Sequence, residues 1–291
     1  MKRSAFSIFL WTFLFGVTPL CSAEQTLWIS PAKEPPKIDG LANDSAWQNV
    51  PTIITYDNIS KLPITIKGTY TSTEIFFLVI FSDPDESRSH KSWTWDKKRG
   101  FYTVGPDRED IFVFKWSMES KPVDLSIYAD NSYKADIWFW KACRTDPAGY
   151  ADDKSHHLSP TDDRHATALV SKAGKPMFLL RTGDEGKSAY KIDLISEFQG
   201  KILPRYIIEK PSGSRSDVRA KGTWKNGRWT IELGRKLYTD NQDDIHFLPT
   251  QKYLFGVARY EIAGREPNEK LSDPLYGTGD INEILWLEFK P

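Results

Sequence analysis

Short apolar runs rich in β-branched and aromatic residues recur along this chain, and they constrain its fold more than any other feature. Turn residues such as Gly, Pro, Asn and Asp bound the runs, and no long stretch after the N-terminus has the 3.6-residue period of a helix. The expected strands are residues 64–70, 75–81, 111–116, 137–140, 222–233, 253–260 and 284–289. Regularly spaced short strands predict a mostly β fold, a single β-sandwich.

Two local signals add detail to this prediction. Asn226-Gly227 is a strong hairpin signal, and around it Trp229, Ile231 and Leu233 alternate onto one face of a strand. The segment 43–47 predicts a short helical turn, capped by its Asn or Asp, with the final tryptophan turned inward.

Between about residues 145 and 217 the strand pattern weakens. Polar residues, Pro, Gly and three of the five histidines gather there. We expect a long loop insertion on the sandwich rather than a second domain, and loops of that length are usually functional.

The N-terminus has the features of a secretory signal. Lys2 and Arg3 precede an apolar run over residues 8–20, and small residues at 21–23 suit cleavage before Glu24. We therefore expect a signal peptide at 1–23, export to the periplasm or beyond, and one domain over 24–291. We expect no membrane span in the exported part, since no later stretch approaches 18 apolar residues.

Composition excludes several classes of function. Removal of the signal leaves the 39 acidic side chains in slight excess, which does not favour nucleic acid. Cys143 is the single cysteine left, so neither an internal disulfide nor a Cys-x-x-Cys-His haem attachment is possible. Motifs for zinc proteases, serine hydrolases, phosphate loops and dinucleotide binding are also absent, so we do not expect an enzyme.

The polar clusters of the expected loop have unremarkable interpretations. Asp152-Asp153 and Asp162-Asp163 are expected to be solvated carboxylates, since adjacent residues on an extended chain point apart. His156, His157 and His165 lie close enough in sequence to bind a metal, but they lack a partner acid or cysteine at ligand spacing, which favours exposed loop histidines.

The run Trp138-Phe139-Trp140-Lys141 is the strongest candidate for a site. In a strand, the two tryptophans share one face while Phe139 and Lys141 share the other. Two interpretations stay open. The aromatic side chains either pack in the core, or they line an apolar cleft for a flat ligand such as a porphyrin or a sugar ring.

Two blocks of sequence carry a family resemblance. The first, Lys37-Ile38-Asp39-Gly40 with Asp44-Ser45-Ala46-Trp47, resembles the opening of carbohydrate-binding module family 9 and its sandwich relatives, a CBM9/DOMON-like fold. The second runs from Asp136 to Ala142, then through Arg144 and residues 147–153. It is similar to the Asp-x-Trp-x-Trp-Lys-Ala and Gly-Tyr-x-Asp-Asp signature of the ethylbenzene dehydrogenase γ-subunit family. Further agreement lies at 174–176, 222–229, 235–237, 243–247 and 255–258.

The resemblance implies a sandwich that holds one b-type haem non-covalently, for electron transfer or as an accessory subunit beside a periplasmic molybdenum oxidoreductase. It points to Trp138, Trp140, Lys141 and Arg144 as haem-binding residues. Lys141 is the implied axial ligand, and a lysine ligates iron only as the neutral amine, which burial favours.

The chain departs from the family where relatives carry an upstream ligand, because residues 125–132 hold no His, Met or Cys. Met118 is the best substitute as second ligand. The bland alternative pairs Lys141 with Asp136 or Asp152 at the surface and leaves Met118 as packing. Other functions to weigh are a carbohydrate- or small-ligand-binding module that stacks its ligand on the two tryptophans, and a purely structural role.

Overall fold

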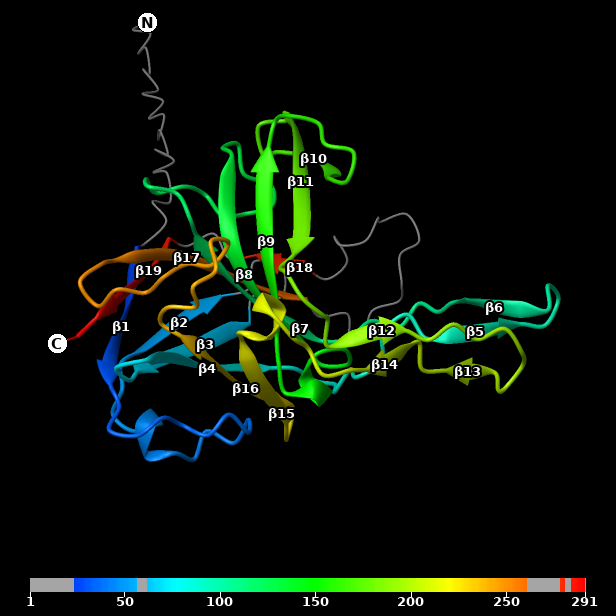
Figure 1. Ribbon diagram of the computed structural model, residues 1–291, viewed down its shortest axis with the longest axis horizontal. Coiled ribbons are helices and arrows are strands. Elements are labelled where there is room, and N and C mark those ends of the chain that lie inside the picture. Colours follow the sequence, from blue (N-terminus) through cyan, green and yellow to red (C-terminus); the bar gives the residue numbers. More distant parts are fainter. Residues whose placement is uncertain (1–23, 57–61, 261–277, 281–283, 291) are drawn as a thin grey trace, which may run out of the picture.

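The computed structural model of the chain describes residues 24–56, 62–260, 278–280 and 284–290 (Figure 1). The expected signal peptide lies outside these residues. Strands dominate the described part, and its helices are the short 3-10 turns Ser45–Trp47 (η1), Asp146–Ala148 (η2) and Ser214–Ser216 (η3). Within these ranges, none of the helices has the length and apolar character needed to cross a membrane.

The first sheet runs in hydrogen-bonded order from β10 at one edge to β19. Its strands in that order are Thr167–Val170 (β10), Pro176–Gly183 (β11), Asp152–Ser159 (β9), Tyr133–Lys141 (β8), Ile111–Ser117 (β7), Tyr253–Tyr260 (β17) and Leu285–Phe289 (β19). The short strand Thr278–Asp280 (β18) also pairs with β17.

The second sheet contains Thr52–Tyr56 (β2), Pro63–Tyr70 (β3), Glu74–Ser82 (β4), Arg228–Lys236 (β16) and Arg219–Trp224 (β15). Strand β1, Gln25–Pro31, connects the two sheets. Its first five residues pair in parallel with β19, and its last two pair in parallel with β3. The N-terminal strand therefore belongs to both sheets.

The main core lies between the two sheets. Phe77 on β4 meets Phe114 on β7 at a ring-centroid distance of 4.9 Å, and Trp229 on β16 meets Trp140 on β8 at the same distance. The buried residues of this cluster come from both inner faces, since alternate residues of each strand point inward. The expected mostly β, sandwich-like fold is confirmed.

The outer face of the first sheet carries a second apolar cluster. Leu125, Ile127 and Ala129, from the segment between β7 and β8, cover one part of this face and pack on Ile137 and Leu158. The rest of the face holds the pocket described below.

The local sequence signals are confirmed. Asn226 and Gly227 have φ values of 53° and 72° in the turn between β15 and β16, as a type I′ hairpin requires. Asp44 is the N-cap residue of η1, although its side chain makes no capping hydrogen bond. Trp47 is buried, and its indole Nε1 donates to Glu232 Oε1 at 2.7 Å.

The expectation of a long loop between 145 and 217 is wrong. Strands β9, β11 and β10 in this segment extend the first sheet. Tyr190–Ile192 (β12) pairs with Tyr206–Ile208 (β14), while Ile202–Leu203 (β13), Trp93–Asp96 (β5) and Phe101–Val104 (β6) form a small sheet. These five short strands project from the sandwich as an arm (Figure 1). Strand β9 has the sequence Asp-Asp-Lys-Ser-His-His-Leu-Ser, which lacks the apolar pattern of a predicted strand. Such a polar strand can be buried because its charges are paired inside the fold rather than solvated.

Candidate functional site

Strand β8 separates the aromatic run into two environments. Trp138 and Trp140 point inward and are fully buried in the main core. Phe139 and Lys141 point to the outer face, opposite Ile111 and Val113 of β7. The period of two along the strand thus sends the two kinds of side chain to different places.

A pocket of about 310 Å³ lies on this outer face and is termed the Lys141 pocket. Its walls are His90, Lys91, Ile111, Phe139, Lys141, Arg144, Lys154, His156, Arg181, Tyr190 and Tyr260. The volume is at the lower end of small-molecule sites, and the walls combine aromatic rings with five cationic side chains.

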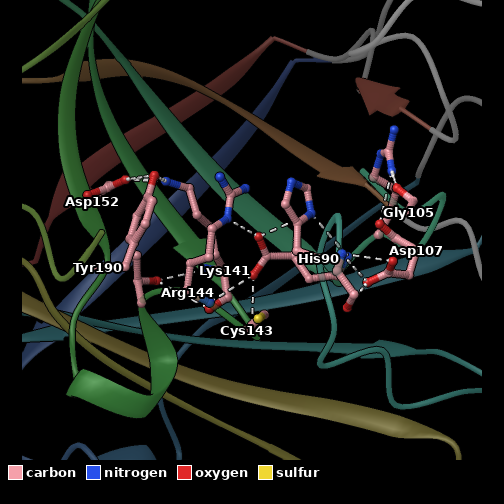
Figure 2. Close-up of polar contacts among 12 residues, drawn as sticks. His90, Gly105, Asp107, Lys141, Cys143, Arg144, Asp152 and Tyr190 are labelled. Carbon is pink, nitrogen blue, oxygen red and sulfur yellow. Dashed lines mark hydrogen bonds and ion pairs between the residues drawn. The ribbon is translucent and has the colours of Figure 1, made fainter. Parts of the chain in front are cut away.

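Lys141 is only 2% exposed and is held by polar groups from distant segments. Its ammonium forms an ion pair with Asp152 on β9 and donates to the Tyr190 hydroxyl at 3.1 Å. Figure 2 shows these three side chains pointing toward one another. Arg215 Nη2 lies 3.2 Å from the other oxygen of Asp152, so this carboxylate has two cationic partners.

A second ion pair lies beside the first. Buried Glu109 pairs with Arg144, and its Oε2 accepts the backbone N–H groups of Cys143 and Arg144 at 2.7 and 3.0 Å. His90 Nδ1 lies 3.5 Å from Glu109 Oε1 (Figure 2). The Arg144 guanidinium also faces the ring of Tyr190 at 5.2 Å. Arg144 is therefore held by both charge and aromatic contact.

Burial shifts the protonation of the two pocket lysines. It lowers the pKa of Lys141 to about 8, against the opposing pull of Asp152. Burial and the nearby Lys141 charge likewise lower the pKa of Lys154 to about 8. Burial works to raise the pKa of Asp152, but the Lys141 ammonium outweighs it and the net shift is downward. At pH 7 about a tenth of each amine is therefore neutral, far more than for an exposed lysine with a pKa of about 10.4.

Two histidines of the pocket are neutral. Burial, with Arg144 next, lowers the pKa of His90 to about 2. Burial and the charges of Lys115 and Lys154 hold the pKa of His156 well below its usual range. His156 is 3% exposed, and neither of its ring nitrogens has a hydrogen-bond partner among the described residues. Its imidazole is a nitrogen donor not engaged elsewhere.

The structure brings Lys141 and Arg144 together in the pocket but leaves Trp138 and Trp140 out of it. Both indoles lie in the core, as the packing interpretation expects, so neither ring lines this pocket. Phe139 is the member of the run that lines the pocket with Lys141.

Met118 lies far from Lys141. Its backbone N–H donates to Lys134 O, which is seven residues before Lys141 on β8. A strand rises about 3.3 Å per residue, so about 23 Å separates the two positions. Met118 is 37% exposed and lines a different groove, of about 420 Å³, with Trp286. The two side chains therefore cannot bind one iron from opposite sides.

The simpler expectations hold only in part. Lys141 does pair with Asp152, but inside the fold rather than at the surface. Asp152 and Asp153 point apart as expected, yet both are buried rather than solvated. His157 and His165 are exposed, while His156 is buried in the pocket wall.

Tyr190, Tyr260 and His90 were missed from the sequence. Tyr190 is 49 positions from Lys141 and begins the short strand β12, while Tyr260 ends β17. Local patterns carry no signal for such contacts, because only strand pairing brings these residues to one face.

The fold and site define a β-sandwich with a basic, aromatic-walled pocket on the outer face of one sheet. The sequence matches the ethylbenzene dehydrogenase family over residues 42–266, and the chain belongs to this family. A search of curated proteins finds no match.

Two solved structures show a likeness in overall shape. Both are of a carbohydrate-binding module of family 9 from Caldicellulosiruptor kristjanssonii. The complex with glucose has 10% identity and a TM-score of 0.41, and covers 92% of this chain and 96% of that one. The complex with cellotriose has 10% identity and a TM-score of 0.40, and covers 91% and 94%.

Proposed function

We propose that this chain binds one b-type haem non-covalently in the Lys141 pocket and serves electron transfer as an accessory subunit rather than as an enzyme. The observation that carries the proposal is the buried amine of Lys141, whose pKa of about 8 makes the neutral, ligating form accessible. Membership of the ethylbenzene dehydrogenase family supports the same function.

The donor set of the pocket fits this cofactor. Lys141 offers a nitrogen ligand, and the unpartnered imidazole of His156 is the next candidate in the pocket wall. His156 pairs with Ala135, six residues before Lys141 on β8, so about 20 Å of strand separates them and they are alternative ligands rather than an axial pair. Phe139 and Tyr260 offer apolar faces to a flat ring, and the many cations suit carboxylate groups such as propionates. Bound haem iron would supply reversible one-electron transfer.

Lys141 can lose its proton while the buried carboxylate of Asp152 still has a cationic partner. Arg215 Nη2 lies 3.2 Å from Asp152, so the carboxylate still has a cationic partner if Lys141 loses its proton. An uncompensated buried carboxylate would cost several kcal/mol, about 3–5 when a partner is removed. Because Arg215 compensates the charge of Asp152, the neutral form of Lys141 avoids this free-energy cost.

The test is the absorption spectrum of protein expressed with its export signal, or reconstituted with haem. We expect a Soret band with sharp reduced α and β bands. Lys141→Ala should convert the low-spin spectrum to high-spin or lose the haem. Lys134→Ala, exposed on the same strand, is the matched control. An unchanged spectrum in Lys141→Ala removes Lys141 as a ligand and makes His156 the next candidate, tested by His156→Ala. A flat visible spectrum contradicts haem binding altogether.

A second candidate is a haem-free module for a carbohydrate or another small ligand. The charge of the pocket favours it, because Lys91, Lys154 and Arg181 join Lys141 and Arg144 around one cavity. Such a pocket suits an acidic ligand, such as a carboxylated sugar, better than a neutral one. A flat visible spectrum with saturable binding of an acidic oligosaccharide, lost in Arg144→Ala, would support it.

We also propose export and a redox partner. Lys2, Arg3 and the apolar run after them support cleavage after Ala23, which N-terminal sequencing of periplasmic protein tests by reading from Glu24. A sequence that begins at Met1 would contradict it. The partner that we propose is a periplasmic molybdenum oxidoreductase. Co-purification from the native periplasm, with molybdenum in the complex, is the corresponding test.

A further inference from the structure

A group of buried carboxylates surrounds Arg235 on the inner face of the first sheet. Arg235 Nη1, from β16, lies 2.7 Å from Asp136 Oδ2, 3.4 Å from Asp244 Oδ1 and 3.8 Å from Asp153 Oδ2. Asp136 is on β8, Asp153 is on β9, and Asp244 is in the segment between β16 and β17. One potential ligand atom from each of the three carboxylates lies within 4.8 Å of those of the other two.

The negative charge of this group exceeds what Arg235 can balance. With all three carboxylates ionised, the group and its one guanidinium would carry a net charge of −2. Among the residues that the structure describes, Arg235 is the cation with which Asp136, Asp153 and Asp244 form ion pairs. Asp184, also largely buried, lies close enough to add to the same negative field. Uncompensated charge in a core is expensive, so either bound protons or a further cation must neutralise it.

The hydrogen-bond pattern points to a cation as the missing partner. Asp153 is fully buried, and neither of its carboxylate oxygens accepts a hydrogen bond within the described part of the chain. Asp136 Oδ1 and Asp244 Oδ1 likewise lack a donor, although Asp136 Oδ2 accepts from both Arg235 and the Ile245 backbone. Buried carboxylate oxygens normally have partners, and the three carboxylates that carry unpartnered oxygens here lie together around Arg235.

We propose that Asp136, Asp153 and Asp244 bind a divalent cation of the calcium type. One such ion cancels the net charge of −2. The donors are all oxygens, which suits hard cations and not zinc, whose sites in proteins use histidine and cysteine. Several carboxylates in an irregular, water-poor site suit Ca²⁺ better than Mg²⁺, which demands octahedral geometry and keeps its waters.

The site joins three separate parts of the chain. It connects strands β8 and β9 of the first sheet to the segment that follows β16 of the second sheet. Asp136 and Asp153 lie in the second of the two blocks that resemble the ethylbenzene dehydrogenase family, and Asp244 lies in the further agreement at residues 243–247. The site is separate from the Lys141 pocket, which lies on the opposite face of the sheet, and the proposal does not rest on haem binding.

The experiment measures metal binding on the full exported chain. Protein treated with a chelator is titrated with Tb³⁺ under tryptophan excitation, since the Trp138 ring lies 4.9 Å from the Arg235 guanidinium carbon and can sensitise emission. We expect saturation at one equivalent and displacement by Ca²⁺. At a calcium concentration about 100-fold above Kd, the melting temperature should rise by about 5–10 °C, while equal Mg²⁺ has a smaller effect.

Asp153→Asn and Asp244→Asn should each abolish the sensitised emission and the calcium-dependent rise in melting temperature. Asp162→Asn, in an exposed acidic pair, should leave both unchanged. Circular dichroism establishes that each variant is folded, and Asp244→Asn serves if Asp153→Asn is not. Absence of emission and of any calcium-dependent change in the wild-type protein overturns the proposal. An infrared band of a protonated carboxyl that persists in calcium and disappears in Asp153→Asn also overturns it, since a proton then replaces the cation.

Discussion

Asp152 and Asp153 are neighbours on β9 whose carboxylates serve opposite faces of the same sheet. Asp152 points outward and pairs with Lys141 in the pocket, whereas Asp153 points inward and lies 3.8 Å from Arg235 in the core. Both are buried. The alternation of a strand thus places one acid in the proposed haem site and the next in the proposed cation site.

Removal of Asp152 should destabilise the fold strongly. Asp152→Ala leaves the buried ammonium of Lys141 without its carboxylate, and breaking a buried pair from one side costs about 3–5 kcal/mol. Urea denaturation measures the loss. Asp124→Ala is the control, because its pair with Lys172 is half exposed and should contribute only about 0–1 kcal/mol. Equal effects of the two substitutions would contradict the buried pair.

His90 should make the fold sensitive to acid. Its pKa is about 2 in the folded state, against about 6.5 in an unfolded chain. As pH falls below about 6.5, the unfolded chain binds a proton at His90 that the folded protein does not bind, so the free energy of unfolding decreases. The slope from this residue is about 1.4 kcal/mol per pH unit. His90→Gln should reduce the slope measured by urea denaturation between pH 6.5 and 4.5, and exposed His157→Gln should not. An unchanged slope in His90→Gln would show that this histidine is charged in the fold.

Gly222 allows Trp140 to pack against β15. A Cβ at Gly222 would lie 2.4 Å from Cζ2 of the indole, closer than atoms can approach. Gly222→Ala should therefore displace the ring and cost about 1–3 kcal/mol, measured by chemical denaturation. Gly256→Ala is the control, since its new Cβ would meet Leu125 at an ordinary 3.6 Å. A neutral Gly222→Ala would mean that the indole packs elsewhere.

The two sheets should unfold together as one domain. Strand β1 pairs in parallel with both β19 and β3, so both ends of the chain contribute to a shared core. We expect tryptophan fluorescence and far-ultraviolet circular dichroism to report one coincident transition. Deletion of residues 24–31 should abolish it. Limited proteolysis between residues 150 and 215 that releases two independently folded halves would contradict a single domain.

The sequence alone determined the elements whose causes are local. Asn226-Gly227 adopts the positive φ angles that its residue types favour, and the hairpin follows. The alternation of Trp138 and Trp140 with Phe139 and Lys141 likewise sets which side chains share a face. These features depend on backbone sterics and on the period of a strand, which neighbouring residues decide.

The tertiary structure decided which of those faces is the core and which holds the pocket. The polar strand β9 can be recognised only in the folded structure, where Lys141 pairs with Asp152 and Arg235 pairs with Asp153. Strand register likewise separated Met118 from Lys141 and brought Tyr190 to it. Burial of a charge depends on a counter-charge from another strand, and pairing between distant segments is a property of the whole packed fold, which no local pattern contains.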